Sequence, residues 1–155
     1  MKTIPRAAWR RIAVLAALSI LPSGLLAAPV TAAPAKNASL SQAANVVYQL
    51  QYYMDGVSLL ADLTPSTDPE RLVGLPGQYL SRAVFTDARA SNGEINGIVE
   101  VFEYPVDLRR RRSTMKRFPD EIDVVSGTIL LRLLGVSTDY AEYYRIALND
   151  YIVLY

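Results

Sequence analysis

The sequence contains no cysteine and no histidine among its 155 residues. Without cysteine the chain forms no disulfide, so a folded domain has to be stabilised by its packed core. Without either residue type, it cannot build a Ser-His-Asp or Cys-His nucleophile, or the usual ligand sets for zinc, copper and iron. A glycine-rich phosphate loop is also missing, because Gly93 and Gly97 fall in a predicted hairpin loop with no helix after it. We therefore expect no cofactor and no metal, and we do not predict an enzyme.

Paired carboxylates are the remaining route to catalysis. A glycosidase needs two opposed carboxylates in a cleft, and a two-layer domain of this size rarely builds one. Asp120, Glu121 and Asp123 are close enough in sequence to suggest calcium, but they lack the glycine and the spaced ligands of a dedicated loop. We interpret these acids as solvated charge at the entrance to a strand.

The N-terminal segment has the three parts of a secretory signal peptide. Residues 1–11 carry four cations and no acid, an apolar run follows from Ile12 to Ala28, and small residues extend to Ala35. A membrane anchor fits less well, because Pro22 interrupts a run that is already short for a span. We predict a secreted or periplasmic protein that meets the membrane only transiently, through its signal peptide.

Two details of export stay open. Cleavage after Ala32 and cleavage after Ala35 both place small residues at the required positions, and the pair Arg10-Arg11 leaves the twin-arginine route as an alternative. We predict a signal peptide over residues 1–32, a flexible leader over 33–41 and a single domain over 42–155.

Removal of the signal peptide changes the net charge. Four of the 16 Lys and Arg residues lie in that segment, so 12 remain against all 15 Asp and Glu, a net charge of −3. Six of the remaining cations fall between Arg109 and Arg117. An acidic protein with one concentrated basic cluster argues against general nucleic-acid binding.

Apolar spacing predicts three helices. The first spans residues 40–63, with Ser39 and Gln42 as a capping box and Gly56 as a break near its end. The second starts at Pro105 and ends before Pro119, and the third begins after Gly135.

Strand patterns occupy the rest of the domain. Gln78–Asp87 and Ile95–Tyr104 predict a β-hairpin, with a cross-strand pair between Arg82 and Glu100. In 121–134, Ser126-Gly127 is either a tight hairpin or a bulge in one long strand. We predict an α+β two-layer sandwich with a three- to four-stranded, mostly antiparallel sheet, and with helices 106–118 and 138–152 on one face.

Several segments resemble a group of small exported bacterial proteins, many of them lipoprotein-like. These segments are LTPSTDPERLVGLPGQYLSRAVFTDAR, GIVEVFEY before a helix and VVSGTILLRLLG before the last helix. The resemblance covers residues 62–150 and implies a secreted α+β domain, without an activity that could be transferred. This chain departs from the lipoprotein pattern because it lacks a lipid-attachment cysteine.

The basic cluster is the strongest functional signal in the sequence. At ~100° per helical residue, its four consecutive arginines cannot share one face, but at least three can point outward and bind phosphate, sulfate or carboxylate. We predict a non-enzymatic binding module that contacts an anionic ligand or partner: lipid headgroups, a cell-wall polymer or an acidic protein. The predicted ligand-binding residues are Arg109, Arg110, Arg112, Lys116 and Arg117.

Two alternatives to this hypothesis stay open. The arginines could form a solvated helix face whose charge is satisfied by Asp107, Asp120 and Glu121. The protein could instead be a structural or assembly subunit that forms a homo-oligomer through the tyrosine-rich helix faces of Tyr140–Tyr155.

Overall fold

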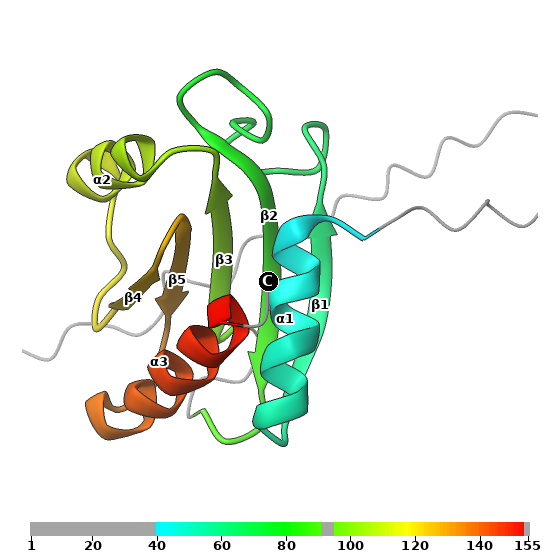
Figure 1. Cartoon of the computed structure of the whole chain (residues 1–155), viewed down its shortest axis with the longest axis vertical. Coiled ribbons are helices and arrows are strands. Elements are labelled where there is room, and N and C mark those ends of the chain that lie inside the picture. The colour runs from blue at the N-terminus through cyan, green and yellow to red at the C-terminus, as the bar shows by residue number, and fades with distance from the viewer. Residues whose placement is uncertain (1–39, 91–94, 154–155) are drawn as a thin grey trace, which may run out of the picture. The chain divides into compact units, whose positions relative to one another are not determined.

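The computed structural model describes residues 40–90 and 95–153, and their side chains up to residue 150 (Figure 1). The predicted signal peptide, most of the leader and the loop residues 91–94 lie outside this part of the chain. Within it, no helix has the length and hydropathy that a membrane crossing requires. The elements are α1 (Gln42–Tyr53), β1 (Val57–Leu63), β2 (Tyr79–Asp87), β3 (Gly97–Phe102), α2 (Pro105–Thr114), β4 (Ile122–Ser126), β5 (Ile129–Leu133) and α3 (Thr138–Val153).

The strands form one antiparallel sheet in the order β1-β2-β3-β5-β4, which confirms the α+β class. The sheet has five strands, more than predicted, and two local features explain the difference. The first helix ends at Tyr53, and Gly56, at φ +95°, turns the chain into β1. The Gly56 carbonyl accepts the N–H of Ala88, so that β1 runs beside β2 instead of continuing as helix. Gly127, at φ +57°, turns the chain between paired Ser126 and Ile129, so this segment is a hairpin.

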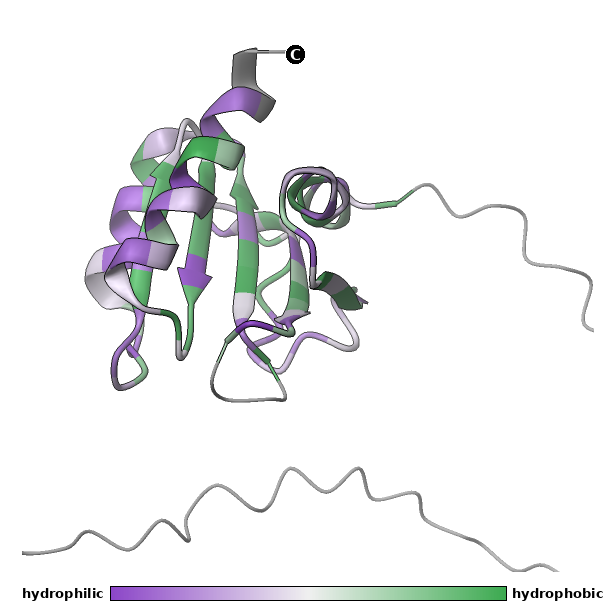
Figure 2. Cartoon of the chain, turned by 90° about the horizontal axis from the view of Figure 1, so that it is seen from below, coloured by the Kyte–Doolittle hydropathy of each residue, from purple (hydrophilic) through white to green (hydrophobic). Residues whose placement is uncertain are grey.

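One face of the sheet carries the main apolar core beneath α1 and α3. Alternate strand residues such as Phe85, Val99 and Leu131 point to this face, where they pack with Val47 of α1 and Leu148 of α3. Both helices lie in front of the sheet in Figure 1, and hydrophobic residues dominate the strands in Figure 2. This arrangement gives the protein a continuous core without disulfides.

The opposite face carries α2 and the loop 64–78. Tyr79, Phe102 and Leu130 project there and form a second, smaller cluster with Leu108 of α2. The prediction that residues 106–118 and 138–152 share one face is therefore wrong. Both faces of β3 carry apolar residues. The alternation of apolar and polar residues along this strand therefore does not identify the sheet face on which α2 packs.

Ser41 joins the start of α1 to β1. Its hydroxyl accepts the N–H of Ala44 as an N-cap and donates to Asp62 Oδ1 at 2.5 Å. The capping residue is thus Ser41, whereas the predicted cap, Ser39, lies outside the described residues. The folded domain consequently begins inside the segment predicted to be a flexible leader.

Candidate anion-binding surface and its buried support

A buried carboxylate in the middle of β3 organises the sheet face that carries α2. Glu100 has no exposed surface, and it accepts a fork of two hydrogen bonds from Arg111, from Nε at 3.2 Å and from Nη2 at 3.0 Å. Arg82 Nε and Arg132 Nη1 each lie 3.6 Å from the same carboxylate. The predicted pairing of Arg82 with Glu100 is confirmed, in a buried setting instead of the exposed one expected for a hairpin pair.

Three further carboxylates complete this network, which we call the Glu100 network. Asp68 accepts hydrogen bonds from Arg82 Nη1 and the Tyr79 hydroxyl, both at 2.7 Å. Glu70 accepts from Arg111 Nη2 at 2.7 Å. Glu121 accepts from Arg132 Nε at 2.8 Å and from Nη2 at 2.9 Å. Because these residues come from distant segments, the network ties the loop 64–78, α2 and the chain before β4 to the sheet.

Ion pairing keeps the outer carboxylates of the network ionised. Burial works to raise the pKa of Asp68, but hydrogen bonds from Tyr79, the Leu72 N–H and Arg82 lower that pKa below its ordinary value. The pKa values of Glu70 and Glu121 are also lowered, because bonds from Arg111 and Arg132 outweigh burial. Carboxyls of this kind suit structural pairing more than general acid catalysis at neutral pH.

The acids expected to be solvated charge before β4 are mostly paired. The side chain of Glu121 is fully buried against Arg132, and that of Asp123 is 3% exposed and accepts hydrogen bonds from Arg112 and Arg117. The interpretation of Glu121 and Asp123 as solvated is therefore wrong, because arginines from α2 and β5 cover them. In the described part of the chain, no group of three or more acidic side chains is placed to hold a metal ion.

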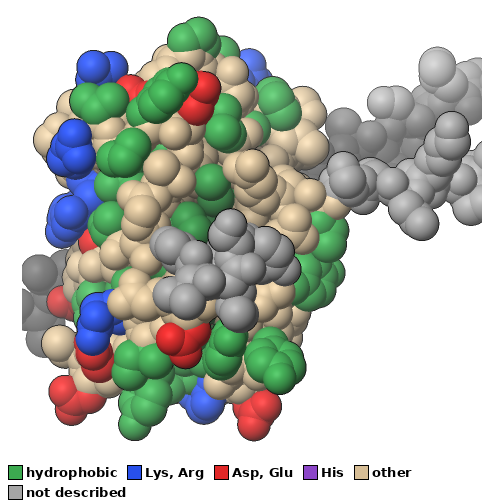
Figure 3. All heavy atoms as spheres, viewed as in Figure 1, with side chains coloured by type: hydrophobic (Ala, Val, Ile, Leu, Met, Phe, Trp, Pro, Cys, Tyr) green, Lys and Arg blue, Asp and Glu red, His purple; other side chains and the backbone are tan. Residues whose placement is uncertain are grey.

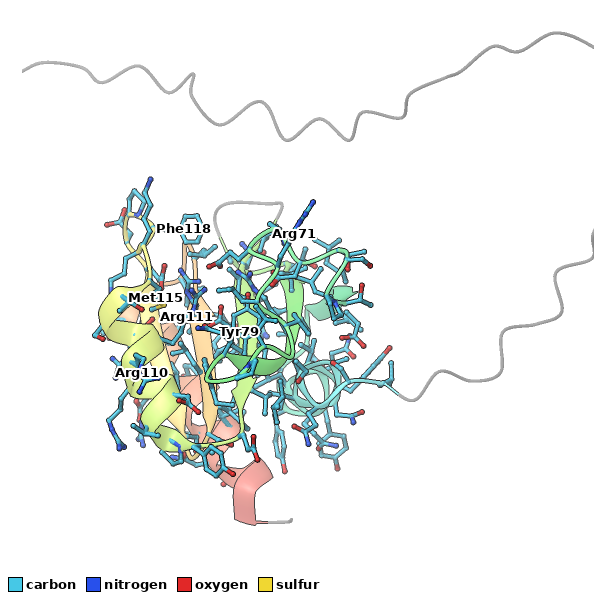
Figure 4. All side chains as sticks on the ribbon, turned by 90° about the horizontal axis from the view of Figure 1, so that it is seen from above. Arg71, Tyr79, Arg110, Arg111, Met115 and Phe118 are labelled. Atoms are coloured by element: carbon cyan, nitrogen blue, oxygen red, sulfur yellow. The ribbon has the colours of Figure 1, made fainter. Side chains whose placement is uncertain are left out.

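Arg111 determines which way α2 faces. Figure 4 shows its side chain between the helix and the strands, on the side of Tyr79. Its guanidinium carbon lies 5.4 Å from the centroid of the Tyr79 ring, and Arg82 lies at the same distance. With Asp107, Leu108 and Arg111 on the buried side, the ~100° rotation per residue turns Val106, Arg109, Arg110 and Ser113 outward.

Of the five predicted binding residues, Arg109 and Arg110 project from this outer side, and Lys116 lies just after the end of the helix. Arg109 and Lys116 are exposed, and neither side chain forms an ion pair with a described residue. The side chain of Arg110 is 65% exposed, and its Nη1 lies 3.7 Å from Asp107 Oδ1. Blue side chains gather in Figure 3 along the edge where Figure 1 places α2.

The other two predicted binding residues share one carboxylate. Arg112 Nε donates to Asp123 Oδ2 at 3.1 Å, and Arg117 Nη2 donates to the same oxygen at 2.5 Å. Their side chains remain 41% and 49% exposed. The structure thus places all five residues around α2 and its C-terminal end, and it holds Arg112 and Arg117 at the border with β4.

The sequence prediction omitted the residues that orient this surface. Glu100 and Arg132 each interrupt an otherwise apolar strand, and Arg82 is flanked on β2 by the buried residues Ser81 and Ala83. A charge in such a position has to find a partner, because an unpaired buried charge is very costly. That signal could have indicated a buried network, but not which arginine of α2 would join it.

The described tyrosines of α3 do not form one free face. Tyr144 is buried and donates to Asp87 Oδ2 at 2.5 Å, and Tyr140 is half-buried beside it. Tyr143 is 62% exposed, and the side chains of Tyr151 and Tyr155 lie outside the described part of the chain. The homo-oligomer hypothesis stays a prediction, with Tyr143 as its exposed residue on this helix.

No family model, curated protein or solved structure matches the chain. Function therefore has to be inferred from the chemistry of its own residues. Two features have the composition of a contact site: the outer side of α2, and a cavity on the opposite face of the sheet.

Proposed function

We propose that the protein is a non-enzymatic binding module that contacts an anionic ligand or partner through the outer side of α2. The observation that carries the proposal is the inward fork from Arg111 to Glu100, which fixes the helix on the sheet. Arg109 and Arg110 are then held outward on a supported element. Guanidinium groups in such positions bind phosphate, sulfate or carboxylate bidentately. We call the set Arg109, Arg110, Arg112, Lys116 and Arg117 the α2 surface.

The ion pairs around the α2 surface leave an excess of positive charge. Among the described residues, Asp107 and Asp123 are the acids that pair with its five cations. Glu103 and Asp120 are exposed near the two ends of the helix and form no ion pair with any of the five. Because one carboxylate serves both Arg112 and Arg117, an incoming anion has donors left to bind.

A polyanion of uniform charge tests the proposal directly. We expect the protein to bind polyphosphate with an affinity that falls steeply with salt, because each bound cation releases counterions. Arg109→Ser should lower the slope of log K against log salt by about one. Arg145→Ser is the matched control, because it removes an equally exposed guanidinium from α3 and should leave the slope unchanged.

A second variant should strengthen binding. Asp123→Asn removes the charge that Arg112 and Arg117 share, so we expect a several-fold higher affinity for polyphosphate at low salt. Fluorescence anisotropy of a labelled polyphosphate measures both variants. Equal salt slopes for the Arg109 and Arg145 variants, together with no gain from Asp123→Asn, would refute a role for the α2 surface.

A further inference from the structure

A cavity of about 430 Å³ lies between α1 and α3, on the sheet face opposite α2. Its volume is within the range of roughly 300–1,000 Å³ that is typical of small-molecule sites. The described residues that line it are Tyr53, Met54, Arg89, Tyr140, Tyr143, Ile146 and Ala147. The wall is therefore largely apolar and aromatic, with one charged side chain.

The walls keep apolar surface available to a ligand. Tyr53, Tyr143 and Ile146 are 41%, 62% and 49% exposed although they line a concave site. The rings of Tyr140 and Tyr143 lie side by side, with their centroids 5.9 Å apart. A flat aromatic group that lies against this pair of rings can pack edge-to-face or offset on them.

Arg89 is held at this cavity by groups beneath it. Its Nε lies 3.4 Å from Asp87 Oδ1, and its guanidinium carbon lies 5.1 Å from the centroid of the Tyr140 ring. Asp87 is itself fixed, because its buried carboxylate accepts the Tyr144 hydroxyl and the Arg89 N–H. Its Nε faces Asp87, which leaves the end of the guanidinium with its two terminal nitrogens able to donate to a carboxylate bidentately.

The hydroxyl of Tyr140 interacts with the same pair of residues, Asp87 and Arg89. Burial, followed by the nearby carboxylate of Asp87, raises the pKa of Tyr140 to about 12, so the hydroxyl stays protonated at neutral pH. The hydroxyl faces the Asp87 carboxylate and Arg89, so it helps to hold the arginine at the cavity.

We infer that the cavity binds a planar aromatic monocarboxylate, with its carboxylate on Arg89 and its ring among the tyrosines. The charge of the ligand follows from Arg89, which is the one charged side chain among the described residues that line the cavity. The shape of the ligand follows from the three tyrosines and the aliphatic wall. This site is independent of the α2 surface, since its residues come from α1, α3 and the chain after β2.

The test compares a carboxylate with its neutral counterpart. We would titrate the purified protein with 2-naphthylacetate and with 2-naphthylacetamide, and follow binding by isothermal titration calorimetry and ¹H–¹⁵N NMR. We expect shifts at Arg89 and along the facing sides of α1 and α3. The amide, which lacks the charge, should bind about tenfold more weakly or worse.

Substitutions assign the interaction to the cavity. Arg89→Met should weaken 2-naphthylacetate binding about tenfold or more, and Tyr143→Ala should weaken it by removing an exposed part of the wall. Arg145→Met is the control, because that arginine lies on α3 but is paired with Glu142 and does not line the cavity. It should bind like the parent protein.

Four outcomes would overturn the inference. The acid and the amide could bind equally, or Arg89→Met could bind unchanged. Naphthylacetate could shift residues of α2 alone, which would move the anion to the α2 surface and leave the proposed function standing. A protein that fails to bind the probe and sediments as a dimer that Tyr143→Ala disrupts would show that a second copy occupies the cavity.

Discussion

At the scale of single residues, consecutive arginines of α2 have opposite environments. Arg111 is 8% exposed and is bound by Glu100 and Glu70, whereas Arg109 is exposed and pairs with no described acid. Their side chains are chemically identical, so position on the helix alone separates a structural role from a surface role. Removing each in turn should reveal the difference.

Arg111→Met should lower the free energy of unfolding by about 3 kcal/mol, because it leaves the fully buried Glu100 without its best partner. Arg109→Met should change it by no more than about 0.5 kcal/mol, as is usual for an exposed side chain. Urea denaturation followed by circular dichroism measures both values.

The double variant Arg111→Met/Glu100→Gln separates lost charge pairing from lost packing. If the pair is the cause, the double variant should be less destabilised than the sum of the two single variants. Equal losses for Arg111→Met and Arg109→Met would mean that the Glu100 network does not hold α2.

At the scale of elements, the sequence predicted most helices and strands and missed one strand. Val57–Leu63 has apolar residues at a spacing that also suits a helix, so it was predicted to continue α1. What makes it a strand is its pairing with β2, from Val57 with Asp87 to Leu63 with Arg82. Such pairing is a long-range property that periodicity does not contain.

The sequence predicted the candidate site only in part, because the contacts that orient it are also long-range. The sequence showed a helix rich in arginine, but a run of four arginines leaves open which of them turns inward. Only the position of Glu100 on the neighbouring strand selects Arg111. Likewise, the spacing of Tyr140 and Tyr144 predicted a helix face, while the buried Asp87 that receives Tyr144 comes from β2.

The pairing of β2 with β3 depends on one glycine. Gly97 lies opposite Phe85 in the register, and a Cβ at Gly97 would meet the Phe85 ring at 2.0 Å. We expect Gly97→Ala to lower the free energy of unfolding by about 1–3 kcal/mol, since the ring and strand have to shift within a packed core.

Phe85→Leu offers the matched test of that clash. In a Phe85→Leu background the ring is gone, so adding Gly97→Ala should be less destabilising than in the parent protein. Thermal unfolding of the parent protein, the two single variants and the double variant gives the coupling free energy between the two substitutions. If Gly97→Ala lowered the free energy of unfolding equally in both backgrounds, the cause would be a change in backbone flexibility instead of contact with the ring.

At the scale of the whole molecule, the two faces of the sheet are stabilised by different chemistry. The face under α1 and α3 is an apolar core, whereas the face under α2 combines a small apolar cluster with the Glu100 network. On the apolar face, the carboxyl with a lowered pKa is Asp87, whereas the pKa values of Tyr140 and Tyr144 are raised. Stability should therefore depend on pH mainly through the carboxyls that the arginines and tyrosines hold ionised.

The direction of that dependence follows from the pKa values of Asp68, Glu70, Asp87 and Glu121, all of which are lowered in the folded protein. An unfolded chain, with ordinary carboxyl pKa values near 4, binds protons before the folded protein does. Their contribution to stability is therefore complete above about pH 5 and is lost as the pH falls through the folded values.

We expect urea denaturation to give a level free energy of unfolding between about pH 5 and 8 and a steep fall below about pH 4. Asp68→Asn should make that fall shallower, by up to about 1.4 kcal/mol per pH unit for the one proton removed. A stability that stays level down to pH 3 in the parent protein would contradict the ionised, paired state of these carboxyls.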